Sequence, residues 1–262
     1  DLLVIPLGVL GAAIATLIAQ AVSAVLVTVT LMYRTEGMKL CLSQIRMYKR
    51  MLQSILKIGL PAGFEAIMYS ISNIIVQVSI NNFGVDTMAA WTAYSKIDFI
   101  FWMINSAFGI SVMTFVGQNY GAGKWDRIRR GTKICLGMAL ISAVSVSIIL
   151  MSAERFLFGI FVNDAGVVEI GIHMMNVIAP AYLLFAFIEV FSGALRAQGA
   201  VVVSTLITMV GICVLRMIWV TLVAAHGTLE QVIICYPITW AAGALAMSIY
   251  YIYKQRKIFQ AR

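Results

Sequence analysis

The stretch GQNYGAGKWDRIRRG, Gly117–Gly131, decides between two very different folds. Its glycines, lysine and basic run resemble a phosphate-binding loop, which reads G-x-x-x-x-G-K-[ST] and joins a strand to a helix. Here Lys124 is followed by Trp125, so the hydroxyl that would hold magnesium is missing, and Gly117 lies one residue too far from Gly123. The segments on either side therefore decide what this stretch is.

Those segments are long and apolar. The chain is 61% hydrophobic and 11% charged, whereas soluble domains are roughly 45–50% apolar and about 25% charged. A membrane-spanning helix needs about 20 apolar residues, and the segments lack the alternation of barrel strands. We therefore predict an all-α integral membrane protein with about seven transmembrane helices. The predicted spans are 3–33, 54–82, 87–117, 132–151, 170–197, 200–225 and 231–254.

Basic residues mark one side of the membrane. Most of the 19 lysines and arginines lie in the connections 34–57 and 118–133, at Arg196 and in the tail 254–262. The opposite connections are mostly acidic. The positive-inside rule predicts a multi-pass protein of the cell membrane, with the amino end outside and the carboxyl tail in the cytoplasm.

The opening stretch then becomes a cytoplasmic turn between two membrane helices, and we expect neither a nucleotide nor a nucleic-acid site there. Glycine supports tight chain reversal, and the basic run anchors the next helix at the lipid surface. The residues of this turn motif are Gly117, Gln118, Asn119, Gly121 and Gly123.

No enzymatic motif is present in the sequence. It shows no Ser/His/Asp or Cys/His arrangement, no metal-binding cluster and no cofactor motif. The four cysteines have no metal-ligand spacing, and we expect free thiols. We therefore predict that the chain is not an enzyme and holds no metal or cofactor. The cysteines are Cys41, Cys135, Cys213 and Cys235.

Polar side chains form stripes along three apolar segments. Such stripes in lipid line either a polar helix–helix interface or a central cavity, and periodicity alone leaves both open. On 54–82 the stripe is Glu65, Tyr69, Ser72, Asn73, Gln77 and Asn81; on 87–117 it is Ser95, Asp98, Trp102, Asn105 and Gly109; on 170–197 it is Tyr182, Glu189, Ser192 and Arg196. Lys96 faces away from Asp98 and either snorkels outward or meets another helix.

Depth along the helices suggests two pairings. Counted at about 1.5 Å per residue, Glu65 and Glu189 lie at similar depth in the cytoplasmic half, and Asp98 and Arg216 lie at similar depth nearer the outside. We predict a structural ion pair between Arg216 and Asp98. Glu65 beside Glu189 would be a like-charge pair, in which one carboxylate keeps a proton near neutral pH and can carry a proton or a sodium ion.

Six segments together resemble the multidrug and toxic compound extrusion (MATE) family, especially its bacterial branch. The turn F-x-GQN-x-GAG followed by a basic helix start is the most specific of them. They are IGLPAGFEAIMYSISNIIVQVSINNFG (58–84), AAWTAYSKID (89–98), FVGQNYGAGKWDRIRRG (115–131), EVFSGALRAQG (189–199), GICVLRMIW (211–219) and YPITW (236–240).

The resemblance implies an organisation in two six-helix lobes around a cavity. This chain then looks like the last helix of the first lobe (1–33), a cytoplasmic linker (34–53), a second six-helix lobe (54–257) and a cytoplasmic tail (258–262). The first five helices are expected to be missing, in agreement with a chain that starts without methionine. Some members place cation-site acids on the first and fourth helices of this lobe, where Glu65 and Glu189 lie shifted by a turn or more.

The function implied is efflux of organic, often cationic, compounds in exchange for H⁺ or Na⁺, by alternating access. The expected partners are such small molecules, membrane lipids and the missing first lobe of the same protein. The residues expected to meet substrate or ion are Glu65, Asp98, Glu189, Tyr69, Asn73, Gln77, Trp102 and Asn105. Alternatives are a flippase for lipid-linked saccharides of related architecture, a seven-helix receptor, and a structural membrane protein.

Overall fold

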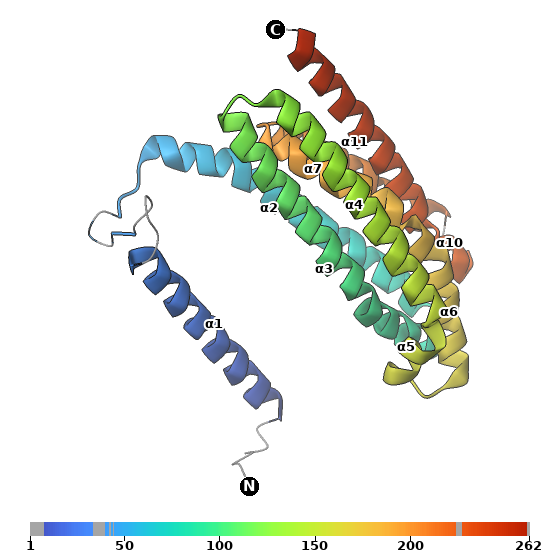
Figure 1. Ribbon diagram of the computed structural model, residues 1–262. Helices are drawn as coiled ribbons and strands as arrows, with labels where there is room; N and C mark the ends of the chain where they lie inside the picture. Colours follow the sequence, from blue (N-terminus) through green and yellow to red (C-terminus); the bar gives the residue numbers. More distant parts are fainter. Residues whose placement is uncertain (1–7, 34–39, 42, 44, 224–226, 261–262) are drawn as a thin grey trace. The chain divides into compact units, whose positions relative to one another are not determined.

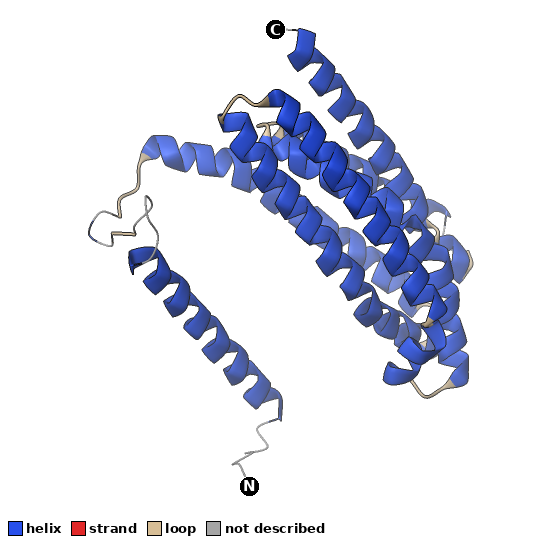
Figure 2. Ribbon diagram, in the orientation of Figure 1, coloured by secondary structure: helices blue, strands red, loops and turns tan. Residues whose placement is uncertain are grey.

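The computed structural model describes residues 8–33, 40–41, 43, 45–223 and 227–260. Within these residues the regular structure is helical throughout, without a strand (Figure 2). The prediction of an all-α protein is therefore confirmed for the described part of the chain.

The chain divides into two compact units, Asp1–Ser54 and Ile55–Arg262. The first holds helix α1 (Gly8–Tyr33) and the start of α2 (Lys49–Asn81). The second holds the remainder of α2 and every later helix. The division into a first-lobe helix, a linker and a second lobe stays a prediction. Parts of the segments 1–33, 34–53 and 258–262 lie outside the described residues, namely 1–7, 34–39, 42, 44 and 261–262.

The second unit is built from helices joined by short turns (Figure 1). After α2 come α3 (Val85–Gly121), α4 (Trp125–Ser152), α5 (Glu154–Phe161), α6 (Ala165–Ile178), η2 (Ala179–Ala181), α7 (Tyr182–Ala197), α8 (Val201–Thr208), η3 (Met209–Val214), α9 (Leu215–Ile218), η4 (Trp219–Val223), α10 (Leu229–Ile233) and α11 (Cys235–Gln260).

Seven helical stretches in the described residues are long and apolar enough to cross a membrane, which confirms the predicted number. They are Ala13–Tyr33, Lys49–Asn81, Val85–Gly121, Trp125–Ser152, Ala165–Ala197, Val201–Val223 and Leu229–Ile258. Five of them begin earlier than predicted. At Lys49 and Trp125 the reason is that the helix continues through basic residues, which a search for apolar segments leaves out. The short helix α5 was not predicted, and its Phe158 ring packs against Gly171 of α6.

Helix α7 lies at the centre of the second unit and packs against α3, α4 and α11. Its closest approach to α3 is at two glycines, where a Cβ on Gly193 would lie 2.7 Å from the carbonyl oxygen of Gly109. Small residues allow helix backbones to come this close in membranes. This crossing fixes the polar face of α7 against the polar face of α3.

The Gly117–Gly131 stretch is a helix–turn–helix connection, as predicted, and not a strand–helix loop. The prediction that the glycines of this stretch support the chain reversal needs correction. Gly117 lies inside α3, whereas Gly123 alone among the turn glycines has a positive φ, at 67°. Asn119 is buried and its amide nitrogen donates to the Phe115 carbonyl over 2.8 Å, while Gln118 is exposed. Gly131 leaves room for the Phe115 ring.

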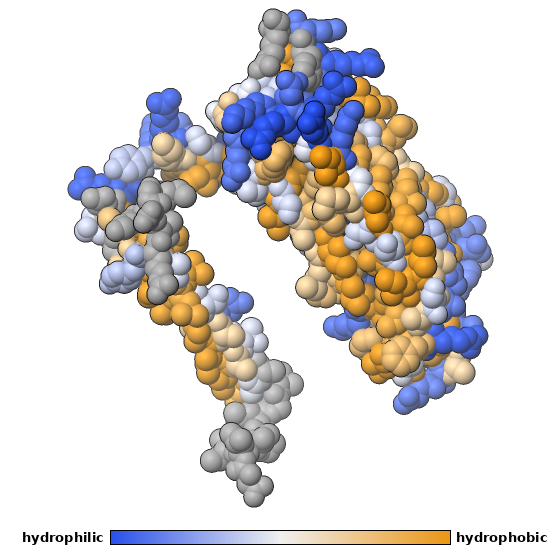
Figure 3. Space-filling model, in the orientation of Figure 1, coloured by the Kyte–Doolittle hydropathy of each residue, from blue (hydrophilic) through white to orange (hydrophobic). Residues whose placement is uncertain are grey.

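The surface of the second unit shows an apolar band between two hydrophilic ends (Figure 3). Large apolar side chains in this band are exposed, for example Ile141 at 70% and Leu245 at 64%. Water would disfavour such a surface, but lipid matches it. The distribution therefore agrees with helices that span a bilayer.

Candidate functional site

A recess of about 490 Å³ in the second unit is lined mainly by aromatic and polar side chains. Helices α2, α3, α6 and α11 contribute its walls. We call it the aromatic pocket; its lining residues are Tyr69, Asn73, Gln77, Trp91, Tyr94, Ser95, Asp98, Phe99, Trp102, Ile178, Tyr236 and Trp240. Asp98 is the one acidic or basic residue in this lining.

The Asp98 carboxylate is held by hydrogen bonds to both of its oxygens. The indole Nε1 of Trp102 donates to Oδ2 over 2.6 Å, and the hydroxyl of Tyr182 donates to Oδ1. The hydroxyls of Tyr182 and Tyr94 are in turn 3.1 Å apart. Tyr182 also stacks on Phe101, with ring centroids 3.8 Å apart. The carboxylate is therefore fixed by two helices, α3 and α7.

Arg216 does not form the predicted ion pair with Asp98. Its Nη1 donates to the side-chain oxygen of Asn73 over 3.2 Å. Its guanidinium carbon lies 4.2 Å from the ring centre of Tyr236 and 5.8 Å from that of Tyr69. Arg216 is 1% exposed. Similar depth was the basis of the prediction, but depth does not specify which way a side chain points.

The helix that carries Arg216 departs from α geometry on both sides of it. Arg216 belongs to the single turn α9, between the π-helical segments η3 and η4. π-helical turns widen the helix by one residue and occur often at functional sites. The wider turns change the direction in which the side chains point. A prediction based on a regular period of 3.6 residues therefore places these side chains on the wrong face.

A second, smaller pocket of about 260 Å³ adjoins the first and shares Tyr69 and Trp102 with it. We call it the acidic pocket. Its lining residues are Glu65, Tyr69, Trp102, Asn105, Ser106, Phe185, Ile188, Glu189, Ser192, Arg196 and Thr208.

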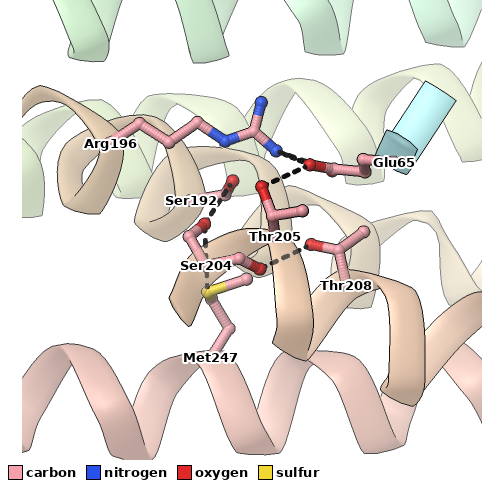
Figure 4. A network of polar contacts seen from close by, with 7 residues as sticks. All are labelled: Glu65, Ser192, Arg196, Ser204, Thr205, Thr208 and Met247. Carbon is pink, nitrogen blue, oxygen red and sulfur yellow. Dashed lines mark hydrogen bonds and ion pairs between the residues drawn. The ribbon is translucent and has the colours of Figure 1, made fainter. Parts of the chain in front are cut away.

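Glu65 of the acidic pocket is engaged by two groups from other helices, α7 and α8 (Figure 4). Nη2 of Arg196 lies 2.6 Å from its Oε1 and 2.7 Å from its Oε2. The Thr205 hydroxyl donates to Oε2 over 2.9 Å. Below this contact, the hydroxyls of Ser192 and Ser204 lie 2.9 Å apart. Glu65 is thus an anchored carboxylate.

Glu189 reaches the same pocket without such an anchor. Its carboxylate lies over Gly109, where an added Cβ would be 2.1 Å from Oε1. The ion pairs found among the described residues are Arg155–Glu169 and Arg196–Glu65. The predicted meeting of Glu65 and Glu189 in one site therefore agrees with the structure. The predicted simple like-charge pair needs correction, because Arg196 neutralises Glu65.

The structure sorts the predicted site residues into the two pockets. Five of them line the aromatic pocket: Tyr69, Asn73, Gln77, Asp98 and Trp102. Glu65, Asn105 and Glu189 line the acidic pocket. The polar stripes thus face pockets and not only helix interfaces. Lys96 is exposed beside Gln77 in a neighbouring groove.

Sequence reasoning missed several residues that line the two pockets or donate hydrogen bonds to their carboxylates. Trp91 and Tyr94 precede Asp98 by seven and four residues, so helical spacing could have placed them on its face. Tyr182 was on a predicted stripe but was not chosen as a site residue. Arg196 was also on that stripe and was expected at a cytoplasmic turn, but it was not among the predicted site residues. Thr205 carried no signal in the sequence. Among the described residues there is no group of three or more His, Cys, Asp or Glu able to hold a metal.

The helices and their paired pockets define the class of this chain, a multi-pass α-helical membrane protein with polar recesses inside its lobe. A family model described as MatE matches residues 61–222, which is more than half of the chain. The chain belongs to the MatE family, the multidrug and toxic compound extrusion family that the sequence motifs predicted. This family is one of transporters, which confirms the prediction that the chain is not an enzyme.

Named relatives and a solved structure support the same assignment. The chain is 25% identical over 260 residues to the probable multidrug resistance protein YoeA of Bacillus subtilis (strain 168), covering 96% of this chain and 56% of the relative. It is 23% identical to the multidrug export protein MepA of Staphylococcus saprophyticus, covering 83% and 51%.

The fold matches that of a multidrug resistance MATE family transporter of the MOP superfamily in an outward-facing conformation. The TM-score is 0.87 at 18% identity, with 97% of this chain and 59% of the other covered. The chain thus spans a little over half the length of each of these three proteins.

Proposed function

We propose that this chain is part of a multidrug efflux transporter that exports organic cations by antiport against H⁺ or Na⁺. The observation that carries the proposal is Asp98 in the wall of an aromatic pocket. Six tryptophan and tyrosine rings line that pocket with it, together with Phe99. The family membership and the named relatives support a transporter.

The chemistry of the aromatic pocket suits a lipophilic cation. Aromatic faces attract positive charge through the ring quadrupole, and a carboxylate supplies the opposite charge. A volume of about 490 Å³ lies in the range of small-molecule sites. A lipid-linked saccharide flippase would favour a basic cavity for anionic phosphates, whereas Asp98 gives this pocket an acidic side chain.

We assign the coupling cation to the acidic pocket. Glu65 and Glu189 provide carboxylates, and the shared walls Tyr69 and Trp102 separate them from the aromatic pocket. Substrate and coupling cation then bind at neighbouring sites of one lobe. Alternation between two lobes around such sites is typical of secondary transporters, and the partner of this lobe would be a first lobe of the same protein.

The proposed orientation places the α3–α4 turn and the end of α11 in the cytoplasm of a cell membrane. Both carry exposed basic residues, among them Arg127, Arg130 and Arg256. Membrane lipids with anionic headgroups attract such residues, and the amino end would lie outside.

The test is efflux of a fluorescent organic cation from proteoliposomes that contain the protein expressed from its complete gene. A proton or a sodium gradient is imposed for wild type, Asp98→Asn and, as a control on the same helix, Asp86→Asn. We expect efflux to follow one gradient, to fall at least about tenfold in Asp98→Asn through the lost charge, and to be unchanged in Asp86→Asn. Export of a saccharide lipid without export of the cation would support the flippase.

A further inference from the structure

The acidic pocket holds three charged side chains: Glu65 on α2, and Glu189 and Arg196 on α7. Its remaining lining is neutral. Helix α3 contributes Trp102, Asn105 and Ser106, and α8 contributes Thr208. Two carboxylates and one guanidinium leave one net negative charge. A pocket of this charge is balanced by one monovalent cation.

The contact between Arg196 and Glu65 uses only part of the guanidinium. Nη2 reaches both carboxylate oxygens, whereas a fork-shaped pairing would use two nitrogens. Nε of Arg196 is buried without a hydrogen-bond partner. The Arg196 side chain is 30% exposed and that of Glu65 is 14% exposed. Arg196 therefore keeps donors that it can offer to another carboxylate.

That other carboxylate is Glu189. It lines the same pocket and is within electrostatic range of both Arg196 and Glu65. Glu189 and Arg196 are separated by about two helical turns on the same face of α7, so the arginine can lean back toward Glu189 if Glu65 no longer holds it. In the structure Arg196 holds Glu65, and Glu189 is the carboxylate of this pocket that has no ion-pair partner among the described residues.

We propose that Arg196 acts as a tethered cation, that is, a positive charge supplied by the chain itself. It pairs with Glu65 and so leaves Glu189 to bind a single coupling cation. The proposal rests on the proposed antiport and divides the roles of the two acids. Glu189 carries the H⁺ or Na⁺. Glu65 holds Arg196 away from Glu189 and acts as a positioning residue.

This arrangement predicts an unusual pattern of cation binding among variants. Glu65→Gln frees Arg196 to pair with Glu189, so cation binding is lost although Glu65 is not the carrier. Removing Arg196 as well returns the pocket to one net negative charge. The double variant Glu65→Gln/Arg196→Gln therefore regains the binding that Glu65→Gln lost. A purely structural ion pair predicts no such recovery.

Cation binding is measured on the purified protein, expressed from its complete gene, by intrinsic tryptophan fluorescence, because Trp102 lines the pocket. Sodium chloride is titrated at alkaline pH, and acid is titrated separately in sodium-free buffer. We expect affinity at least about tenfold higher for Arg196→Gln and at least about tenfold lower for Glu65→Gln, since each changes the pocket by one charge. We expect the double variant to lie within about threefold of wild type.

Two further variants serve as controls. Arg155→Gln removes the other ion pair of the described chain, which is exposed, and is expected to leave the affinity unchanged. Glu189→Gln is expected to abolish the signal in every background. If Arg196→Gln alone does not fold, the comparison of Glu65→Gln with the double variant still decides, because removing both partners of this partly buried pair is milder than removing one.

A double variant that binds as weakly as Glu65→Gln, or more weakly, overturns the role of Arg196. Efflux by the wild-type protein, measured in parallel, separates this result from a failure of the proposed function. Gradient-driven efflux without recovery in the double variant rejects the tethered cation alone. Absence of gradient-driven efflux rejects the antiport itself.

Discussion

Trp102 donates its indole N–H to Asp98 over 2.6 Å, and the same ring forms part of the wall between the aromatic and the acidic pocket. Trp102 thus orients the Asp98 carboxylate, which we propose binds the substrate, and also contacts the proposed ion site. Tyr182 donates to the other oxygen of that carboxylate. Asp98 is consequently held in one rotamer by donors from two helices.

The first prediction concerns these two donors. Tyr182→Phe removes one hydrogen bond to Asp98 and keeps the ring that stacks on Phe101. A lost hydrogen bond to a charged group is worth about 1.5–3 kcal/mol, so we expect KM for an organic cation to rise roughly tenfold. The matched control is Tyr253→Phe, at an exposed tyrosine. An unchanged KM in Tyr182→Phe would show that Asp98 does not meet the substrate.

The second prediction concerns the space above Gly109. In Gly109→Ala the new methyl group would lie 2.1 Å from Oε1 of Glu189, so the carboxylate must move out of its niche. We expect gradient-driven efflux to fall about tenfold or more, through misplacement of a reacting group. Gly137→Ala is the control, because nothing lies within 4 Å of its added Cβ. Equal transport by both variants would remove Glu189 from the coupling step.

The membrane fold could be predicted from the sequence, because lipid leaves few alternatives. Long apolar segments that cannot expose their backbone groups must form helices, and seven of them were counted correctly. The polar stripes also predicted pocket residues, since Asn73 and Gln77 recur at helical spacing with Glu65. Periodicity along one helix was sufficient for these features.

The partners across helices could not be predicted in the same way. Counting residues along the helices placed Arg216 at a depth similar to that of Asp98, but the π-helical turns on either side of Arg216 help to orient it toward Tyr236 and Asn73. Arg196 was expected at a cytoplasmic turn, because it is a basic residue at the end of a span and of its polar stripe, yet it reaches back to Glu65. The spacing of residues along a sequence does not determine how a helix is rotated about its axis, nor where the end of a long side chain lies. Both errors have these causes.

The third prediction compares the effects on stability of alanine at Gly123 and at Gly117. Gly123 has a φ of 67°, a conformation that costs a residue with a Cβ about 1–2 kcal/mol. Gly117 lies inside α3 with nothing within 4 Å of an added Cβ, and alanine favours helix over glycine by about 1 kcal/mol. We expect Gly123→Ala to lower the thermal midpoint and Gly117→Ala to keep or raise it, in detergent-solubilised protein. The reverse order would contradict the structure of this turn.

The last prediction concerns Arg216, a buried cation that contacts Asn73 and two tyrosine rings and forms no ion pair with any described carboxylate. Its Nε and Nη2 lack hydrogen-bond partners among the described residues. A buried charge with incomplete partners contributes little stability, and an apolar side chain of similar length is often equal or better. We expect Arg216→Met to keep or raise the thermal midpoint.

Asn73→Ala gives the complementary comparison. It leaves Arg216 in place but removes the acceptor of its Nη1, which we expect to cost about 1–3 kcal/mol and to lower the midpoint. The double variant Arg216→Met/Asn73→Ala should recover most of that loss, because no charged donor is then left without its acceptor. If Arg216→Met lowers the midpoint more than Asn73→Ala does, stacking on Tyr236 contributes more to stability than the unpartnered charge removes.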